Sequence, residues 1–257
     1  MKQGFASVIS NDEVMPGVYL IWLESPQIAA EAKPGQFVMV GCGEESLLRR
    51  PLSIHQLADT TKLAFLFTVV GKGTHWLSQR QVGGAVDLLG PLGNGYSIHS
   101  TSHHLLLVAG GIGIAPLVFL AQEALNQGSS VTLLLGASTA TQLYPGHLLP
   151  PEAELITTTE DGTAGKKGMI TDLLPDFVGW ADQIFACGPA SMYRDMAARS
   201  RQLLKAKPVQ TSLEVRMGCG LGICYGCTVK TKNGLRQVCK DGPIFNLGDI
   251  LWDELGY

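Results

Sequence analysis

Three cysteines and four glycines occupy the run MGCGLGICYGC, residues 217–227, and a fourth cysteine follows at position 239. Their spacing is Cys219-x4-Cys224-x2-Cys227-x11-Cys239. The order x4 then x2 with a distant fourth cysteine is typical of plant-type 2Fe-2S ferredoxins. A structural zinc site commonly uses two separate Cys-x2-Cys pairs, and this run contains one such pair. We therefore favour a 2Fe-2S cluster over zinc and place disulfides behind both.

The loop between these cysteines must bend tightly, and its glycines allow the bend and turn backbone N–H groups toward the sulfurs. The tail that carries the cysteines, residues 208–257, is too short to maintain a large core of its own, so it must pack on neighbouring structure. The apolar residues around the loop could pack against the α/β domain or against another subunit, and for most of them we expect ordinary local core: Leu221, Ile223, Tyr225, Ile244, Phe245 and Leu251.

A second candidate site combines an arginine with a helix start. The segment RRPLSIH, residues 49–55, places an arginine beside an extended stretch that a proline fixes, and GKGT, residues 71–74, opens a predicted helix. Together the two could hold a pyrophosphate from both sides. The alternative, a surface arginine plus a threonine that caps a helix, is about equally good on these residues alone.

A third candidate site is VAGGIGIAP, residues 108–116, which follows an apolar strand and precedes a helix, as a dinucleotide-binding loop does. Gly111 and Gly113 permit close approach of a phosphate, while Pro116 stands where the usual fingerprint has its third glycine. No arginine follows the next strand to meet a 2′-phosphate, which favours NAD(H) over NADP(H). Cys187, in FACGP, lies at the carboxyl edge of the predicted sheet, although a buried structural cysteine is the commoner role for such a residue.

Three units are predicted along the chain. Short β-rich runs with turn signals over residues 1–98 indicate a small antiparallel barrel or sandwich. Apolar strands that alternate with helical segments over 99–207, including a long helix that ends near Pro208, indicate an α/β domain with a parallel sheet. Residues 208–257 form the cysteine tail, with a short hairpin arm before Cys239.

Composition narrows the function classes. The 257 residues carry a net charge of -3, with 46% hydrophobic and 16% charged residues, which gives no electrostatic reason to expect nucleic acid. The N-terminus lacks the pattern of a secretory signal, and no apolar run approaches the roughly 18 residues of a membrane span. We therefore expect a cytoplasmic protein without membrane contact, in which clustered cysteines bind metal rather than form disulfides.

Six motifs follow in a fixed order: RPLS, GKGT, GGIGIAP, TEDG, CGP and the cysteine tail. In this order they resemble the electron-transfer subunits of class 1B dihydroorotate dehydrogenase, in the ferredoxin-NADP reductase superfamily. The resemblance covers essentially the whole chain. It implies a flavin-binding β-barrel over 1–98, a nicotinamide-binding α/β domain over 99–207 and a 2Fe-2S domain over 208–257.

The resemblance also implies site residues. The FAD residues are Arg50, Pro51, Leu52, Ser53, Leu66, Phe67, Thr68, Gly73 and Thr74, with Arg50 on the pyrophosphate and Ser53 near the flavin ring. The nicotinamide residues are Gly110, Gly111, Gly113, Pro116, Glu160, Asp161, Gly162, Cys187, Gly188 and Pro189. The cluster ligands are Cys219, Cys224, Cys227 and Cys239. No residue is expected to act as a general acid or base, and Tyr257 is not expected to cover the flavin.

The implied function is electron transfer in pyrimidine biosynthesis. A partner subunit that carries FMN oxidises dihydroorotate, and electrons pass through 2Fe-2S and FAD to NAD+, in a heterotetramer with two copies of each subunit. The nearest alternative is a flavin and iron-sulfur subunit of another complex, of the ferredoxin:NADP oxidoreductase or sulfhydrogenase type. An alternative of another class is an interaction module whose tail holds zinc.

Overall fold

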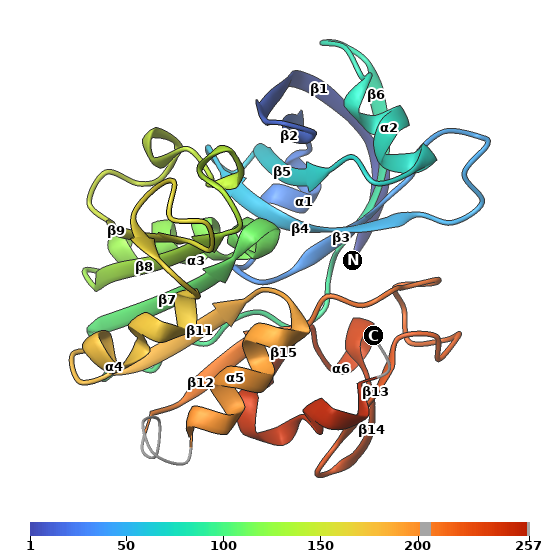
Figure 1. The fold of residues 1–257 in the computed structure, drawn as a ribbon. Helices are drawn as coiled ribbons and strands as arrows, with labels where there is room; N and C mark the ends of the chain where they lie inside the picture. The colour runs from blue at the N-terminus through green and yellow to red at the C-terminus, as the bar shows by residue number, and fades with distance from the viewer. Residues whose placement is uncertain (201–206, 256–257) are drawn as a thin grey trace.

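The computed structural model describes residues 1–200 and 207–255. Figure 1 shows three parts: a closed barrel of the N-terminal strands, a sheet flanked by helices, and a C-terminal tail that lies against both. This architecture confirms the predicted fold class, an antiparallel barrel followed by an α/β domain and a small tail. The bounds predicted for the three units stay a prediction.

The barrel is closed by six antiparallel strands in the order β1-β2-β5-β4-β3-β6. Every second residue of β6 is buried, as expected for a strand with one face toward a core. The core inside the barrel includes the fully buried Phe65 and Ile54. The strands are β1 (Lys2–Met15), β2 (Val18–Glu24), β3 (Phe37–Val40), β4 (Arg50–Leu57), β5 (Lys62–Thr68) and β6 (Ala85–Leu92), with short helices α1 (Pro26–Ala29) and α2 (Lys72–Ser78) between them.

The second part is a seven-stranded sheet in the order β10-β9-β8-β7-β11-β12-β15, parallel except for the β12–β15 pair. Its central strands β7 and β11 are buried almost throughout because helices cover the sheet (Figure 1). The strands are β7 (His104–Gly110), β8 (Ser130–Ala137), β9 (Glu154–Thr159), β10 (Lys166–Lys167), β11 (Gln183–Cys187), β12 (Val209–Ser212) and β15 (Ile244–Asn246).

Helices connect these strands. The helices are α3 (Ala115–Asn126), α4 (Leu174–Phe177) and α5 (Ala190–Ser200), and the 3-10 turns are η1 (Gly111–Ile114), η2 (Ala140–Gln142), η3 (Gly146–Leu148) and η4 (Ile170–Leu173). The helical segment between β9 and β11 is a 3-10 turn followed by a single α-helical turn, because Pro175 stands at the start of α4. The end of the long helix predicted before Pro208 lies outside the described residues, as does Tyr257.

The cysteine tail packs on both other parts, as its small size requires. Its hairpin of β13 (Thr228–Thr231) and β14 (Gly234–Gln237) confirms the predicted arm, and β15 extends the α/β sheet. Trp252 stacks on Tyr193 of α5, with ring centroids 4.8 Å apart. One core cluster joins tail residues to Met39 of the barrel. The remaining tail elements are α6 (Val238–Asp241), η5 (Leu247–Asp249) and η6 (Trp252–Glu254).

No helix in the described part of the chain is long and apolar enough to cross a membrane.

Candidate active site

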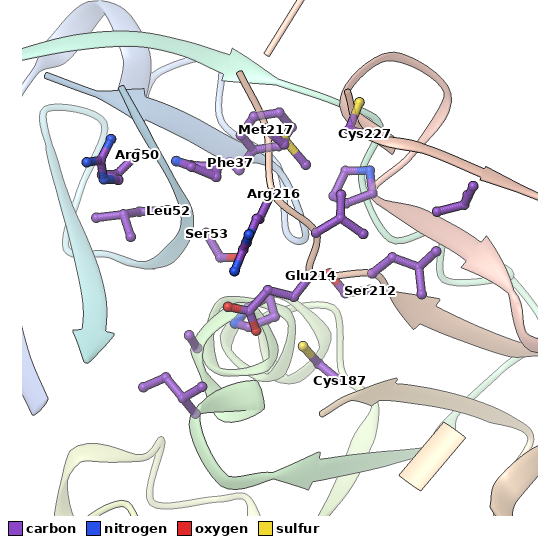
Figure 2. Close-up of a pocket in the computed structure, with 18 of the residues that line it drawn as sticks. Phe37, Arg50, Leu52, Ser53, Cys187, Ser212, Glu214, Arg216, Met217 and Cys227 are labelled. Carbon is purple, nitrogen blue, oxygen red and sulfur yellow. The ribbon is translucent and has the colours of Figure 1, made fainter. Parts of the chain in front are cut away.

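A cavity of about 1380 Å³ opens where the barrel, the α/β domain and the tail meet. Figure 2 shows Arg50, Leu52 and Ser53 on the barrel side and Ser212, Glu214 and Cys227 on the other sides. Eight of the nine residues predicted to bind FAD line this cavity: Arg50, Pro51, Leu52, Ser53, Leu66, Phe67, Thr68 and Thr74. Seven of them lie on β4 and β5, which are neighbours in the barrel, and Thr74 lies in α2.

The ninth predicted residue, Gly73, lies beneath Arg50. A Cβ added at Gly73 would stand 2.8 Å from Nε of Arg50, so the guanidinium rests on the first turn of α2. The arginine and helix start that the sequence suggested as a pair are therefore adjacent. Arg49 has a different role, because its guanidinium forms an ion pair with Asp87 and donates to the carbonyl of Met39.

The hydroxyl of Thr74 organises the turn before α2. Its Oγ1 accepts the N–H groups of Val70 (2.9 Å) and Gly71 (3.2 Å). Because these contacts occupy the hydroxyl, any contact of Thr74 with a phosphate falls to its backbone N–H.

A second cavity of about 640 Å³ lies at the carboxyl ends of the parallel strands, the edge where ligands bind in α/β sheets. Six of the ten residues predicted for the nicotinamide side line it: Gly110, Gly111, Gly113, Glu160, Gly188 and Pro189. Pro116 and Cys187 instead line the larger cavity. Asp161 and Gly162 form a turn beside the smaller one, in which Asp161 accepts the N–H and hydroxyl of Thr163.

The glycines of the loop between β7 and α3 serve two purposes. Gly111 has φ +55°, with nothing within 4 Å of an added Cβ, so it faces open space and suits close approach of a ligand. At Gly113 an added Cβ would stand 2.1 Å from the carbonyl oxygen of Cys187. Gly113 is thus required because the loop packs directly on the backbone of the CGP turn, a protein contact rather than the phosphate approach that its motif suggests.

Glu160 brings a carboxylate to the end of β8, where the sequence directly after that strand has no acidic residue. It follows β9, and its Oε1 accepts a hydrogen bond from Oγ of Ser138, just after β8, at 3.1 Å. Arg199 also lines this cavity, but Asp195 (2.9 Å) and Asp172 (2.9 Å) already pair with it.

The two cavities share three lining residues, Thr68, Ile112 and Glu214. Glu214 is the one ionisable group among them, and Figure 2 shows its carboxylate directed into the space near Cys187. The side chain is open to the cavity but surrounded by protein, and this burial raises the pKa of its carboxyl above the usual value. Burial likewise raises the pKa of the Cys187 thiol to about 12, so Cys187 stays neutral.

Backbone N–H groups surround the cysteine sulfurs, as the glycine-rich loop predicted. Leu221, Ile223 and Cys224 donate to Sγ of Cys219 at 3.3, 3.4 and 3.5 Å. Burial acts to raise the pKa of Cys219, but these N–H groups outweigh it and lower the pKa to about 6. A loop that stabilises thiolate sulfur in this way suits an iron-sulfur cluster, whose ligands are thiolates.

Backbone N–H groups also donate to the sulfurs of Cys239 and Cys227. Gly222 donates to Sγ of Cys239 at 3.1 Å, and the backbone of Cys239 donates to Sγ of Cys227 at 3.4 Å.

The four cysteines are linked in two pairs through their backbones. The N–H of Cys224 donates to Sγ of Cys219 at 3.5 Å, and the N–H of Cys239 donates to Sγ of Cys227 at 3.4 Å. Across residues 1–200 and 207–255, no group of three or more His, Cys, Asp or Glu side chains is placed to hold a single metal ion. Two adjacent pairs of cysteines suit a binuclear cluster, in which each iron takes two thiolates.

The cysteine loop has one buried and one exposed side. Cys227 is buried and lines the larger cavity, whereas Cys224 is exposed. The side chains of Leu221, Ile223 and Tyr225 are 38, 72 and 70% exposed, so local core is wrong for these three, and their contact with another subunit stays a prediction. Tyr225 also has φ 59°, a left-handed conformation unusual for a bulky residue.

Comparisons with known proteins agree with this geometry. The family profile "Iron-sulfur cluster binding domain of dihydroorotate dehydrogenase B" matches residues 214–251. The chain is 40% identical to the "Dihydroorotate dehydrogenase B (NAD(+)), electron transfer subunit" of Desulforamulus reducens, over 96% of this chain and 98% of that protein. The subunit of the same name from Clostridium acetobutylicum is 38% identical, over 99% of this chain and 100% of that protein. The chain belongs to the family of dihydroorotate dehydrogenase B electron transfer subunits.

Among solved structures, one described as "NADH-dependent reduced ferredoxin-NADP oxidoreductase" superposes with a TM-score of 0.88 and 32% identity, over 98% of this chain and 91% of that chain. The chain is therefore an oxidoreductase subunit with an electron-transfer role, and its cofactors are FAD, a 2Fe-2S cluster and NAD(H).

Two residues near the cavities, Glu214 and His55, were not predicted from the sequence as functional residues. Glu214 lies in the run TSLEVRM, near the start of the predicted cysteine tail, where no site residue was predicted. Its acidic side chain, next to the carboxyl end of a buried strand, was the available signal. The other residue is His55, two positions after the flavin motif RPLS, which is completely buried although histidine is polar.

Proposed function

We propose that this subunit relays electrons through a cluster bound by Cys219, Cys224, Cys227 and Cys239, between a partner docked at the exposed loop and FAD in the larger cavity. The observation that carries the proposal is the orientation of the cysteine loop: Cys227 lines the flavin cavity and Cys224 is exposed. A cluster held between these two residues has one side near flavin and the other at the surface. Because a 2Fe-2S cluster carries one electron at a time, it needs a donor on one side and an acceptor on the other.

The residues that line the larger cavity suit FAD, as does the volume of the cavity. We infer that the guanidinium of Arg50 and the backbone N–H groups at Gly73 and Thr74 hold the pyrophosphate, since charge-assisted bonds to phosphate are strong. Ser53, deeper in the cavity, lies near the flavin ring in this assignment. FAD supplies the exchange between single electrons and a hydride. The chain itself binds and orients the cofactors and excludes water.

The smaller cavity suits NAD(H). Its glycine loop, Gly110 to Gly113, provides close backbone approach for the phosphates. The Glu160 carboxylate and Ser138 hydroxyl can bond ribose hydroxyls, and a 2′-phosphate there would meet a negative charge. The wall common to the two cavities lets a nicotinamide reach the flavin beside Glu214.

The partner in this proposal is an FMN-containing catalytic subunit that oxidises dihydroorotate to orotate, in an assembly with two copies of each subunit. Dihydroorotate loses two electrons and two protons, NAD+ takes up both electrons and one proton as a hydride, and one proton is released. Exposed apolar side chains on the loop around Cys224 form a surface for this partner, since such groups on a monomer mark contact sites: Leu221, Ile223 and Tyr225.

The test is co-purification with the catalytic subunit, followed by an assay of dihydroorotate-dependent NAD+ reduction. The complex should catalyse this reaction, and the chain alone should oxidise NADH with artificial acceptors but leave dihydroorotate unchanged. Two irons and two acid-labile sulfides per chain are expected. Oxidation of dihydroorotate by the isolated chain would contradict the subunit role.

The docking surface has its own test. Ile223→Asp places a charge in the proposed contact and should weaken assembly with the catalytic subunit, measured by analytical ultracentrifugation. The matched control is Val82→Asp, on an equally exposed valine (74%) of the barrel, which should assemble normally. If both variants assemble like the wild type, the surface lies elsewhere.

A second candidate function is favoured by the structural similarity at TM-score 0.88, which is to an NADH-dependent reduced ferredoxin-NADP oxidoreductase. In that case the partner would be a larger subunit that uses ferredoxin and NADP. Reduction of NADP+ by ferredoxin and NADH in the purified complex, without dihydroorotate activity, would decide for it.

A further inference from the structure

Strand β4 carries a residue that faces away from the barrel toward the α/β domain. In its pairing with β5, Ile54 lies opposite Phe65 and Gln56 opposite Ala64, so His55 is the extra residue of a β-bulge. Bulges redirect a side chain and are common beside active sites. His55 follows Ser53, which lines the flavin cavity, by two positions.

Both nitrogens of His55 bond to the α/β domain. Nδ1 is 2.8 Å from the carbonyl oxygen of Ala115, and Nε2 is 2.9 Å from the hydroxyl of Tyr144. A carbonyl oxygen only accepts, so Nδ1 carries the hydrogen, and Nε2 therefore accepts the hydrogen of Tyr144. The imidazole is 0% exposed, so no bulk water replaces these bonds if they break.

These partners border the nucleotide cavities. Ala115 begins α3 directly after the glycine loop and lines the larger cavity. Tyr144, itself 2% exposed, follows the 3-10 turn η2, whose residues Thr141 and Gln142 line the smaller cavity. His55 of β4 is thus bonded to the segment that follows the glycine loop and to the segment that follows η2, and both of these loops line the smaller cavity.

The barrel and α3 also meet through apolar side chains. Phe119 of α3 packs in the barrel core, but apolar contact tolerates small sliding motions because it has no preferred direction. Gln56 donates to the carbonyl of Leu148 at a longer distance, 3.3 Å. Two short, roughly opposed hydrogen bonds to one rigid ring fix the relative position of the segments more closely.

We propose that His55 is a positioning residue for hydride transfer. It holds the glycine loop, Gly110 to Gly113, at the distance at which a bound nicotinamide meets the flavin ring. This role rests on the proposed placement of FAD and NAD(H) in the two cavities. His55 does not contact the reacting atoms in it. Hydride transfer depends steeply on geometry, so a small displacement of the loop slows it even when both cofactors stay bound.

The test compares His55→Phe, which keeps a ring and removes both bonds, with His55→Asn, whose amide nitrogen can still donate to Ala115. Both are measured as FAD- and cluster-loaded complexes with the catalytic subunit. In His55→Phe we expect reduction of the flavin by NADH to slow roughly 10- to 100-fold. The long-wavelength absorbance of stacked nicotinamide and flavin should weaken, while flavin content stays at one per chain. His55→Asn should recover part of the rate.

Reduction of the flavin by dihydroorotate is the internal control, because those electrons reach the flavin through the cluster and do not depend on the glycine loop that binds NAD(H). In His55→Phe the rate of this reaction should change less than twofold. If it falls by the same factor as the rate with NADH, the variant has a general structural defect and the proposal is overturned. His147→Phe, at an exposed histidine of the neighbouring turn η3, is the matched control and should be unaffected. Equal rates in His55→Phe and His147→Phe would also overturn it.

If His55→Phe does not fold, Tyr144→Phe removes one of the two bonds and makes the same comparison. Failure of the proposed function is distinguishable, because it would abolish dihydroorotate-driven flavin reduction in the wild-type complex itself.

Discussion

The guanidinium of Arg50 lies on the backbone of Gly73, with Nε 2.8 Å from the point where a Cβ would stand. This contact joins strand β4 to the start of α2 at the edge of the larger cavity. A side chain at position 73 would displace the guanidinium, and the contact places an arginine and a helix start where they can act on the same anion.

Gly73→Ala should therefore weaken FAD binding. The new methyl group pushes the guanidinium away, and the loss of one charge-assisted bond corresponds to roughly a tenfold increase in the FAD dissociation constant. Flavin release on dilution, followed by fluorescence, measures the change. Gly71→Ala is the matched control, since an added Cβ there has nothing within 4 Å, and it should retain FAD normally. Equal affinities for the two variants would contradict a role of Arg50 on the pyrophosphate.

Gly220→Ala should disturb the cysteine loop. Gly220 has φ +71°, and an added Cβ would stand 2.5 Å from Cγ of Met39 in the barrel. Strain of about 1 to 3 kcal/mol at this position should lower the iron content and speed cluster loss in air. Iron analysis and visible absorption check it. Gly248→Ala, in the same tail with open space around it, should keep its cluster, and loss from both would point to general fragility of the tail.

Glu160→Gln should improve binding of NADPH. The negative carboxylate next to Ser138 repels a 2′-phosphate, and Arg199 is already paired with Asp195 and Asp172. Removal of about 1 kcal/mol of repulsion corresponds to roughly fivefold tighter binding of 2′-phospho-ADP-ribose, with ADP-ribose changed less. Calorimetry with both ligands measures this. The exposed Glu152 gives the control variant Glu152→Gln, and if both variants shift alike the effect is long-range charge only.

The stability of the fold should fall between pH 6.5 and pH 4 because of His55. Burial, partly opposed by the bond to the Ala115 carbonyl, lowers the pKa of His55 from 6.5 to about 4. The unfolded chain takes up a proton near pH 6.5 and the folded chain does not, so the stabilising effect is complete above 6.5 and is lost as the pH falls to 4. The loss is up to about 3 kcal/mol.

Urea unfolding at several pH values checks this dependence. His55→Asn removes the titrating group, so its free energy of unfolding should change less with pH over the same window. Identical slopes for the two proteins would show that other groups cause the pH dependence.

Much of the architecture was predictable because the signals are local. The spacing of the cysteines, the strand-glycine-helix order around residue 111 and the alternating strands before residue 98 each depend on neighbours in the sequence. The resemblance to the family added the order of the motifs, and the fold, the cofactors and the family are confirmed. The assignment of single residues to FAD and NAD stays a prediction.

The errors and omissions occur where distant segments meet. Nothing near Gly113 in the sequence shows that it packs on the backbone of Cys187, and nothing near Glu160 shows that it reaches Ser138. Leu221, Ile223 and Tyr225 looked like core because they are apolar, yet the loop turns them outward. Burial of a single side chain depends on the whole surrounding fold, which a local pattern does not contain.

The sequence by itself determined the type of cluster, the order of the units and the kind of nucleotide loop, because each rests on residue types at short, fixed spacings. Only the tertiary structure decided that Cys227 borders the larger cavity, that Glu214 lines both cavities and that His55 of β4 bonds to Ala115 and Tyr144 of the α/β domain. These relationships arise from strands paired across the chain and from surfaces that pack on one another. They become visible only when the fold brings distant residues into contact, as it does for Arg50 and Gly73, 23 positions apart, and for Met39 and Gly220, 181 positions apart.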